Sequence, residues 1–510
     1  MKRRTKRILS VVAATTVALS TFSFAACSKQ EETLTLRVSN WEEYIDLGDW
    51  GDDELIDIDN PYNPDLGGIM GVNSIVDDFT EWFNSGDFGF NIKVEYSTFG
   101  TNEDLYNRLN LGDKYDLVCP SEYMIMKLLN EGKLEKYSSD FFDASNEQNY
   151  YKNNVSPYIA QMFETNGWTE YAACYMWGTT GLVYNPEISA DEDVLSWNIL
   201  RNSDYKRRVT IKDNVRDAYF AALGIYNAET LLDETTSAQM RSELLNATDD
   251  NTIVGAEDVL KEIKENVYSF ETDSGKADMV TGKVVANFQW SGDSVYIMDL
   301  ADEDDTELWY SVPYECTNLW FDGWVMLKDG IDGNKQKKQA AEAFVNFLSR
   351  PDNAVRNMYY IGYTSSIAGG NDMENNVVYN YLNWNYEAGE DVEEVYEYDL
   401  SYFFGEGSDA IVLADKSTFN FDDSNEINQG RQLFAQYPPS NVIERSVVMR
   451  DFGDRLSQIN QMWINVRCLD VKDFNPAVVW TVVGIILAGA VALTLYKFRY
   501  KIFIRKSYEN

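Results

Sequence analysis

The side chains with the clearest potential for chemistry are aromatic rings and carboxylates that stand directly after predicted strands. The first group, "WEEY" at residues 41–44, follows the alternating run "TLTLRV". Similar groups follow four later strand-like runs, namely Ser121, Glu122 and Tyr123; Asp213, Asn214 and Asp217; Trp290, Ser291 and Asp293; and Trp320, Asp322 and Trp324. Arg216 is the exception in a set that otherwise holds almost no basic side chains.

This combination of rings and carboxylates suits an organic cation with a hydrocarbon body. An ammonium group over a tryptophan face gains ~0.5–2 kcal/mol, and a desolvated ammonium also needs carboxylate partners. Methylene groups can lie between rings, as lysine stems lie on apolar surface. Taken singly, each residue has a simpler explanation, because such rings usually belong to the core and such carboxylates usually cap helices. Their coincidence at five strand ends favours a shared binding site.

Strand-like and helix-like segments alternate along the chain, which indicates an α/β fold. Residues 33–135 are predicted as βαβαβα, since alternating runs such as "NIKVEYS" are followed by amphipathic segments such as "TNEDLYNRLNLG". A second α/β series runs from "RVTIKD" to "LWFDGWVML". We therefore expect two lobes joined by more than one crossing. Ligands of such sheets bind beyond the carboxyl ends of the strands.

Two acidic insertions, about 46–68 and about 369–425, interrupt this pattern. Neither matches the spacing of a calcium-binding loop. We expect both to be surface loops, and we expect neither a metal site nor a cofactor.

The composition excludes several classes of function. Histidine is absent, which removes Ser-His-Asp catalysis, histidine zinc sites and imidazole pH switches. The net charge of −40 disfavours nucleic acid as a partner. Four cysteines of the body, Cys119, Cys174, Cys316 and Cys468, are widely spaced. This spacing favours free thiols over a disulfide framework, although a bridge stays open in an exported chain.

The N-terminus is typical of an exported lipoprotein. Five basic residues precede an apolar run that ends in "FAAC", so residues 1–26 are predicted as a signal peptide. Cys27 stands where a bacterial lipobox places its lipidated cysteine, and residues 27–32 would then form a tether. A plain cleaved signal or an uncleaved anchor is the alternative.

The C-terminus carries a second membrane signal. Residues 474–496 hold no charge and have the length of a transmembrane helix. The basic tail at 497–510 would be cytoplasmic by the positive-inside rule, which places the body outside the cell.

Six segments together resemble one known family. They are "NWEEYI", "YDLVCPSEYMIMKLLNEGKLEK", "WGTTGLVYNPE", "FQWSGDS", "LWFDGWVML" and "FLSRPDNAVRNMYYIGYTS". In this order they are similar to the spermidine/putrescine-binding proteins of bacterial ABC transporters, from about Thr33 to Cys468. The resemblance implies a two-lobed periplasmic-binding-protein (Venus-flytrap) fold, with mixed sheets and helices on both faces. Lobe 1 would comprise 33–178 and 322–368, and lobe 2 would comprise 179–321 and 369–473.

The resemblance also implies a set of ligand-binding residues. Carried over position by position, they are Trp41, Glu42, Tyr44, Ser121, Tyr123, Asn214, Asp217, Trp290, Trp320, Asp322 and Tyr363. In the family, the position of Asp322 holds the acid that clamps an ammonium group.

The chain departs from the family pattern at three of its positions. Glu42 stands where relatives carry a hydroxyl residue, and Asn214 stands where they carry an acid. Met449 replaces a ligand-contacting glutamine. These exchanges leave open which polyamine is preferred.

The function implied by the resemblance is that of a membrane-tethered receptor, not an enzyme. It would bind a polyamine outside the cytoplasm and deliver it to an ABC permease and its ATPase. Two other classes stay open. One is a membrane-anchored sensor or receptor for another cationic small molecule or an amino acid. The more remote one is a glycosidase, since tryptophan and paired carboxylates also suit sugars.

Overall fold

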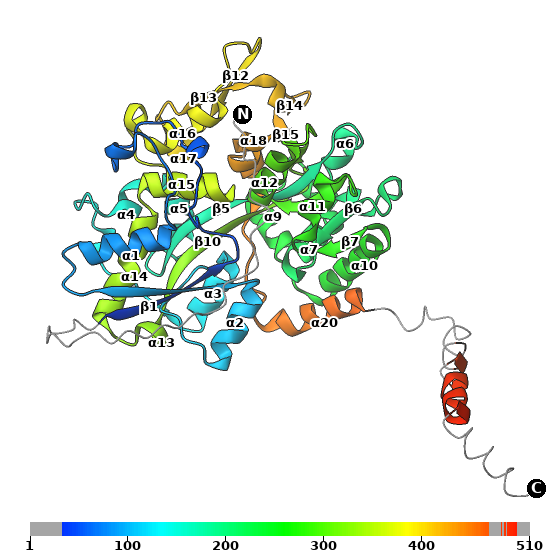
Figure 1. The fold of residues 1–510 in the computed structure, drawn as a ribbon. Helices are drawn as coiled ribbons and strands as arrows, with labels where there is room; N and C mark the ends of the chain where they lie inside the picture. Colours follow the sequence, from blue (N-terminus) through cyan, green and yellow to red (C-terminus); the bar gives the residue numbers. More distant parts are fainter. Residues whose placement is uncertain (1–32, 469–480, 482–483, 486, 497–510) are drawn as a thin grey trace, which may run out of the picture. The chain divides into compact units, whose positions relative to one another are not determined.

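The computed structural model describes residues 33–468, 481, 484, 485 and 487–496. The chain divides into two compact units, one ending at Asp454 and the other beginning at Arg455. The first unit holds the sheets and the helices that cover them (Figure 1). The predicted signal peptide, Cys27 and the tether lie outside the described residues.

The strands are β1 Leu34–Trp41, β2 Ile92–Phe99, β3 Leu117–Val118, β4 Leu134–Glu135, β5 Ala172–Tyr184, β6 Val209–Lys212, β7 Ser269–Glu271, β8 Ala286–Trp290, β9 Trp309–Ser311, β10 Thr317–Leu327, β11 Thr364–Ser365, β12 Val395–Asp399, β13 Ile411–Asp415, β14 Phe419–Phe421, β15 Ile427–Gly430 and β16 Ser446–Val447.

The α-helices are α1 Ile75–Ser85, α2 Asn102–Leu111, α3 Glu122–Asn130, α4 Tyr150–Asn154, α5 Pro157–Thr165, α6 Asp191–Val194, α7 Val215–Tyr226, α8 Ala228–Leu231, α9 Ala238–Leu245, α10 Asp250–Asn266, α11 Ser274–Val280, α12 Ser291–Asp302, α13 Lys328–Ile331, α14 Lys335–Leu348, α15 Pro351–Ile361, α16 Val377–Tyr386, α17 Ser401–Phe404, α18 Gln432–Gln436, α19 Ser440–Glu444 and α20 Leu456–Arg467.

One mixed sheet runs through the first unit, and its two halves meet at a long antiparallel pair. On one side β10 continues to β3, β1 and β2, with β1 parallel to both β2 and β3. On the other side β5 pairs with β8, which is parallel to β6, and β6 is parallel to β7. The βαβαβα prediction for residues 33–135 and the prediction of two α/β series are therefore confirmed.

The junction itself is the ladder between β5 and β10. Every residue of both strands is buried, as expected for strands covered on both faces. The ladder shifts register between Asp322 and Gly323. This irregularity lies in the middle of the strand that carries the predicted ammonium clamp, and such bulges re-aim a side chain.

Helix starts and stops follow the sequence signals. Thr101 caps α2 by accepting a hydrogen bond from the Asp104 backbone amide, and Gly112 ends the helix in the left-handed conformation. Asn214 caps α7 in the same way through the Arg216 amide. The helices then cover the sheet, with α14 packed against β1 and α1 against β2.

The prediction that residues 369–425 form a surface loop is wrong. This insertion folds into helices α16 and α17 and the antiparallel pair of β12 and β13. Tyr398, Leu400, Phe403 and Phe404 are all at most 2% exposed. The acidic residues that dominate its composition lie around an aromatic core. Helix α16 packs against α15 and helix α17 packs against α5, and both of these partners fall within the predicted lobe 1. The assignment of this segment to lobe 2 stays a prediction.

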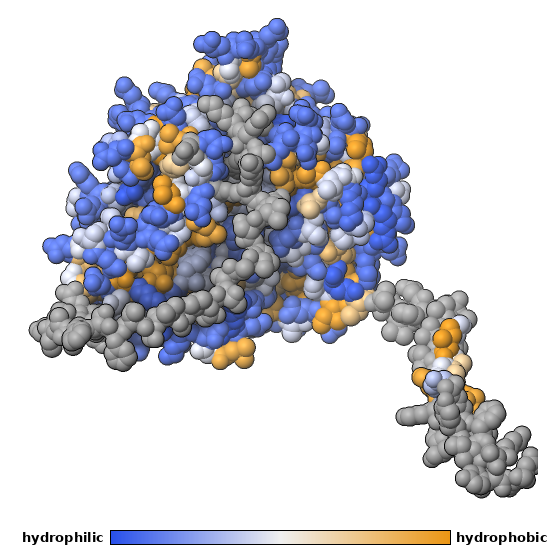
Figure 2. Space-filling view, viewed as in Figure 1, coloured by the Kyte–Doolittle hydropathy of each residue, from blue (hydrophilic) through white to orange (hydrophobic). Residues whose placement is uncertain are grey.

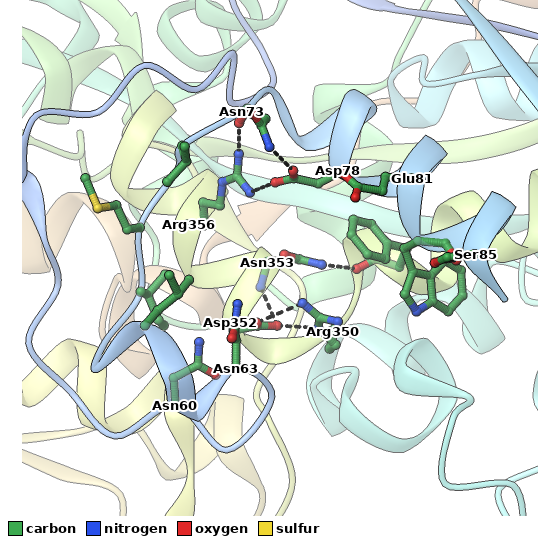
Figure 3. A pocket seen from close by; sticks show the side chains of 16 residues that line it. Asn60, Asn63, Asn73, Asp78, Glu81, Ser85, Arg350, Asp352, Asn353 and Arg356 are labelled. Atoms are coloured by element: carbon green, nitrogen blue, oxygen red, sulfur yellow. Dashed lines mark hydrogen bonds and ion pairs between the residues drawn. The ribbon is translucent and has the colours of Figure 1, made fainter.

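The first insertion begins at a buried ion-pair network. Arg356 of α15 pairs with Asp46, and its Nη1 lies 2.5 Å from Oδ2 of Asp78 in α1. The guanidinium also donates to the carbonyl of Asn73. Three segments far apart in sequence are thus joined by one arginine, as Figure 3 shows for Asn73, Asp78 and Arg356.

Asp46 is the centre of this network, and it lies two residues after Tyr44. Its Oδ1 accepts hydrogen bonds of 2.9 Å from the Gly48 amide and from the Trp50 indole. Its own amide donates to the side chain of Asn357 at 2.9 Å. The network therefore fixes the chain directly after the first predicted group of ligand residues.

None of the helices in the described part of the chain is both long enough and apolar enough to cross a membrane. Of the predicted span 474–496, residues 481, 484, 485 and 487–496 are described, and the predicted tail 497–510 lies outside the described residues.

Replacing Arg356 tests the buried network. Arg356→Met is expected to lower the free energy of unfolding by ~3–5 kcal/mol, because Asp46 would remain as a buried charge without its partner. Urea denaturation measures the change.

Arg201→Met is the matched control, since Arg201 pairs with a largely exposed Glu262. We expect this variant to lose less than ~1 kcal/mol. Equal losses in the two variants would contradict a special role for the buried network.

Candidate functional site

Asp322 is the buried carboxylate at the centre of the predicted site. It lies on β10, is 6% exposed, and accepts hydrogen bonds from two hydroxyl groups. The Tyr44 hydroxyl donates to Oδ2 at 2.8 Å, and the Ser121 hydroxyl donates to Oδ1 at 2.7 Å. Among the described residues, no lysine or arginine side chain forms an ion pair with it. Neutral donors alone thus hold this carboxylate, which leaves its charge without a counter-ion.

Aromatic rings surround Asp322. The rings of Tyr44 and Tyr363 meet edge to face with centroids 4.8 Å apart, and Trp320 meets Tyr363 at 5.7 Å in the same geometry. Tyr363 also lies directly on the backbone of Gly292, where an added Cβ would fall 2.2 Å from the ring. Only glycine allows this approach, so Gly292 sets how closely the ring from the end of α15 reaches the start of α12.

Ser121 and Tyr123 are held in place by one amide. The Asn102 side chain donates to the Ser121 hydroxyl at 3.1 Å and to the Tyr123 hydroxyl at 2.9 Å. It also accepts from the Ser121 backbone amide at 3.1 Å. Asn102 opens helix α2, so the exit of β3 is fixed by the neighbouring βα unit.

A second cluster of charged groups lies at the ends of β6 and β8. Lys212, the last residue of β6, is fully buried, and its Nζ lies 4.1 Å from the Trp290 ring centroid. The same Nζ lies 3.9 Å from Oδ2 of Asp293. Asp293 in turn pairs with Lys276 at 3.0 Å. The sequence did not single out either lysine.

Burial raises the pKa of three carboxyl groups in this region, Asp322, Asp217 and Glu122. The pKa of Asp322 is raised to about 6 by burial, against the lowering effect of its bonds from Ser121 and Tyr44. Burial raises the pKa of Asp217 to about 7, although Lys212 lowers it. Glu122 reaches about 8 because it is buried and near Asp322. Such shifts mark carboxylates that gain from a cationic partner.

Arg216 packs against Tyr123, one of the predicted ligand residues. Its guanidinium carbon is 4.0 Å from the ring centroid of Tyr123 and 3.8 Å from that of Phe452. It also donates to the carbonyl of Arg450 and lies 3.5 Å from Asp451. A cation of the chain itself thus covers one face of a ring that the resemblance assigns to the ligand.

The structure brings together some predicted residues and separates others. Tyr44, Ser121, Trp320, Asp322 and Tyr363 form one connected group. Trp41 is half-buried beside Phe99, and its indole N–H is buried without a hydrogen-bond partner in the described chain.

Glu42 and Asn214 are two predicted ligand residues whose side chains do not contribute to the connected group. Glu42 is exposed, and the side-chain oxygen of Asn214 is occupied as the cap of α7. Glu43 adopts a left-handed conformation with φ 53°. Residues 42 and 43 therefore form a turn, and Tyr44 behind it points inward.

The sequence did not predict Lys212 and Lys276 as part of this region. Lys212 is the end of a strand, one position before the group that was collected. Lys276 lies on a helix without any motif. Glu122 was collected as part of a group, but only the structure places it against the Phe321 amide, which donates to it at 3.2 Å.

A separate cavity of about 380 Å³ lies between the first insertion, α1 and α15 (Figure 3). Arg350 and Asp352 on its wall form a two-pronged ion pair with distances of 2.6 and 2.9 Å. None of the predicted ligand residues lines it.

Comparison with models of protein families matches residues 74–376 to the bacterial extracellular solute-binding proteins. The matched segment is more than half of the chain. The chain belongs to this family. It is a family of solute receptors, so the glycosidase alternative is set aside.

The relatives of this solute-binding protein include periplasmic proteins of known name. The spermidine/putrescine-binding periplasmic proteins of Salmonella typhimurium and Escherichia coli are each 29% identical over 275 residues, which is 53% of this chain and 70% of theirs. The putrescine-binding periplasmic protein of Pseudomonas aeruginosa is 26% identical over 271 residues, which is 51% of this chain and 68% of its own. The resemblance read from the six segments is confirmed.

Solved structures share the two-lobed fold of this solute-binding protein. The spermidine/putrescine ABC transporter substrate-binding protein of Streptococcus pneumoniae aligns with a TM-score of 0.50 and 22% identity, over 84% of this chain and 100% of its own. A lipoprotein of Treponema pallidum aligns with a TM-score of 0.55 and 16% identity, over 85% and 99%.

Cys119, Cys174 and Cys316 are buried free thiols, and Cys468 is exposed. The expectation of free thiols is met for the three buried residues.

The raised carboxyl pKa values predict how stability depends on pH without ligand. A folded pKa above the unfolded value means that the penalty of burying the charge is present above the folded pKa and is relieved as the pH falls through it. As the pH rises from 5 to 8, the free energy of unfolding of Asp217→Asn should therefore increase by roughly 2–3 kcal/mol relative to that of the parent protein.

Urea unfolding at several pH values measures this difference. Asp113→Asn serves as the control, because Asp113 is exposed. If the free energies of unfolding of Asp217→Asn and the parent protein changed in parallel with pH, the pKa of Asp217 would not be raised in the folded protein.

Proposed function

We propose that this protein binds a polyamine outside the cytoplasm and delivers it to an ABC permease and its ATPase. The observation that carries the proposal is Asp322, a buried carboxylate that neutral hydroxyls hold between aromatic rings. Such a group is costly unless a cation pairs with it, and an ammonium group would supply the missing charge. The names of the relatives from Salmonella, Escherichia and Pseudomonas support the same ligand class.

The proposed binding site keeps the full set implied by the resemblance, with roles adjusted to the geometry. Asp322 would receive an ammonium group, and Trp41, Tyr44, Trp320 and Tyr363 would surround it and the adjoining methylenes. Asp217 and Trp290 would face the other part of the ligand. Ser121 and Tyr123 would orient Asp322 and the ring wall, while Asn214 and Glu42 would act at a distance, through the cap of α7 and through surface charge.

Binding would close the cleft by a movement about the strands that connect the lobes, as in other hinge-closing receptors. Arg216 supports such a movement, because its guanidinium meets Tyr123 of the predicted lobe 1 from helix α7 of the predicted lobe 2. The pair is already in contact in this structure, and opening of the lobes would separate it.

The receptor would be held at the outer face of the cell membrane. Cys27 would carry a lipid, and residues 474–496 would span the bilayer with the tail 497–510 in the cytoplasm. The visible face of the described residues is mainly hydrophilic, and apolar residues lie in scattered patches (Figure 2). Two anchors would keep the receptor beside its permease.

Asp322→Asn is expected to weaken polyamine binding by ~2–5 kcal/mol, because it leaves the ligand ammonium buried without a counter-charge. Calorimetry with putrescine and spermidine at pH 7.5 measures the effect.

Asp113→Asn is the control, since it changes an exposed carboxylate outside the site. It should leave the affinity unchanged. An unaltered polyamine affinity in Asp322→Asn would remove Asp322 from the site.

The two anchors predict how the chain fractionates. The full chain and Cys27→Ala should both stay in the membrane pellet after an alkaline wash, because the second anchor suffices. A Cys27→Ala chain that ends at residue 473 should be released. If the full-length Cys27→Ala variant were released from the membrane pellet, the prediction of a C-terminal span would be refuted.

A further inference from the structure

The predicted binding site contains an ammonium group that belongs to the chain. Lys212 is fully buried at the end of β6, and its Nζ donates to the Thr272 carbonyl at 2.9 Å. The same nitrogen lies 4.1 Å from the Trp290 ring centroid and 3.9 Å from the carboxylates of Glu271 and Asp293. A lysine side chain is otherwise among the groups least often buried.

This environment matches what a bound polyamine requires. An ammonium group is stabilised in a dry site by a tryptophan face and by carboxylates, and Lys212 has both. Trp290 is also one of the rings that the proposed function assigns to the ligand. One ring of the site is therefore already in contact with a cation.

The opposite end of the site differs. Asp322 accepts hydrogen bonds from Tyr44 and Ser121 only, and none of the described basic side chains pairs with it. Tyr363 stands between the two ends, since its ring packs on that of Tyr44 while its hydroxyl interacts with Asp293. One end of the row thus lacks a cation, and the other end is filled by Lys212.

We propose that Lys212 takes the place of one ammonium group of the ligand, so that the cleft selects amines with fewer charges. A ligand ammonium that entered beside Trp290 would meet the charge of Lys212 at close range, and like charges in a dry site repel strongly. An amine anchored at Asp322 with a short body avoids this contact. The site should then prefer the diamine putrescine over the triamine spermidine. This inference rests on the proposed function.

Lys212→Met tests the inference, because methionine keeps an unbranched side chain of similar length and removes the charge. We expect the parent protein to bind putrescine more tightly than spermidine. In Lys212→Met the ratio of spermidine affinity to putrescine affinity should rise at least tenfold, as measured by calorimetry at pH 7.5. Lys212→Gln provides a second, polar variant in case the first does not fold.

Lys276→Met is the matched control. Lys276 also pairs with Asp293, at 3.0 Å, but its side chain is 22% exposed and the ring it approaches is Tyr296. Its removal should change the ratio by less than threefold. The control separates the charge on the Trp290 face from the total charge near Asp293.

Three results would overturn the inference. If Lys212 is only structural, both amines lose affinity equally in Lys212→Met and the ratio stays constant. If spermidine already binds the parent protein more tightly than putrescine, the selection is absent although the proposed function holds. If the parent protein binds neither amine, the proposed function fails and the inference fails with it.

Discussion

The ladder between β5 and β10 is the constraint on which the rest of the structure depends. Both strands are buried along their whole length, and each belongs to the half of the sheet on its own side. Residues that follow β1 and β3 and residues that follow β6 and β8 can meet only because this pair joins the halves. The register shift beside Asp322 lies in the same ladder. The position of the central carboxylate is therefore set by the element that unites the fold.

The two ends of the site solve the problem of buried charge differently. Asp322 is held by hydroxyl groups, which satisfy its oxygens and leave its charge uncompensated. Asp293 is compensated by lysines from two elements, Lys212 and Lys276. Since charge pairs in a dry environment dominate recognition of cations, the uncompensated end is where an incoming ammonium group gains most. Under the proposal made for Lys212, the compensated end would limit the charge that a ligand can carry.

Much of the fold and part of the site followed from the sequence, and the limits have physical reasons. Alternating runs and capping residues located β1, α2 and β3, because these signals are local. Strand exits pointed to Tyr44 and Ser121, since the topology of an α/β sheet gathers exits at one edge. Asp322 lies inside β10 and not at its exit. Burial of Lys212 in the site was not predicted, because a lysine at a strand end normally faces solvent. The core of residues 369–425 escaped notice because acidic composition outweighed the spacing of its aromatic residues.

The contact between Tyr363 and Gly292 ties two distant positions to one another. No side chain fits at residue 292 while the ring occupies that space, and a smaller residue at 363 would leave a void against the backbone of α12. The dependence runs one way, because glycine at 292 would tolerate a different residue at 363, whereas a side chain at 292 requires that the Tyr363 ring first move away. A different ring at 363 is therefore open to this chain as long as residue 292 stays glycine.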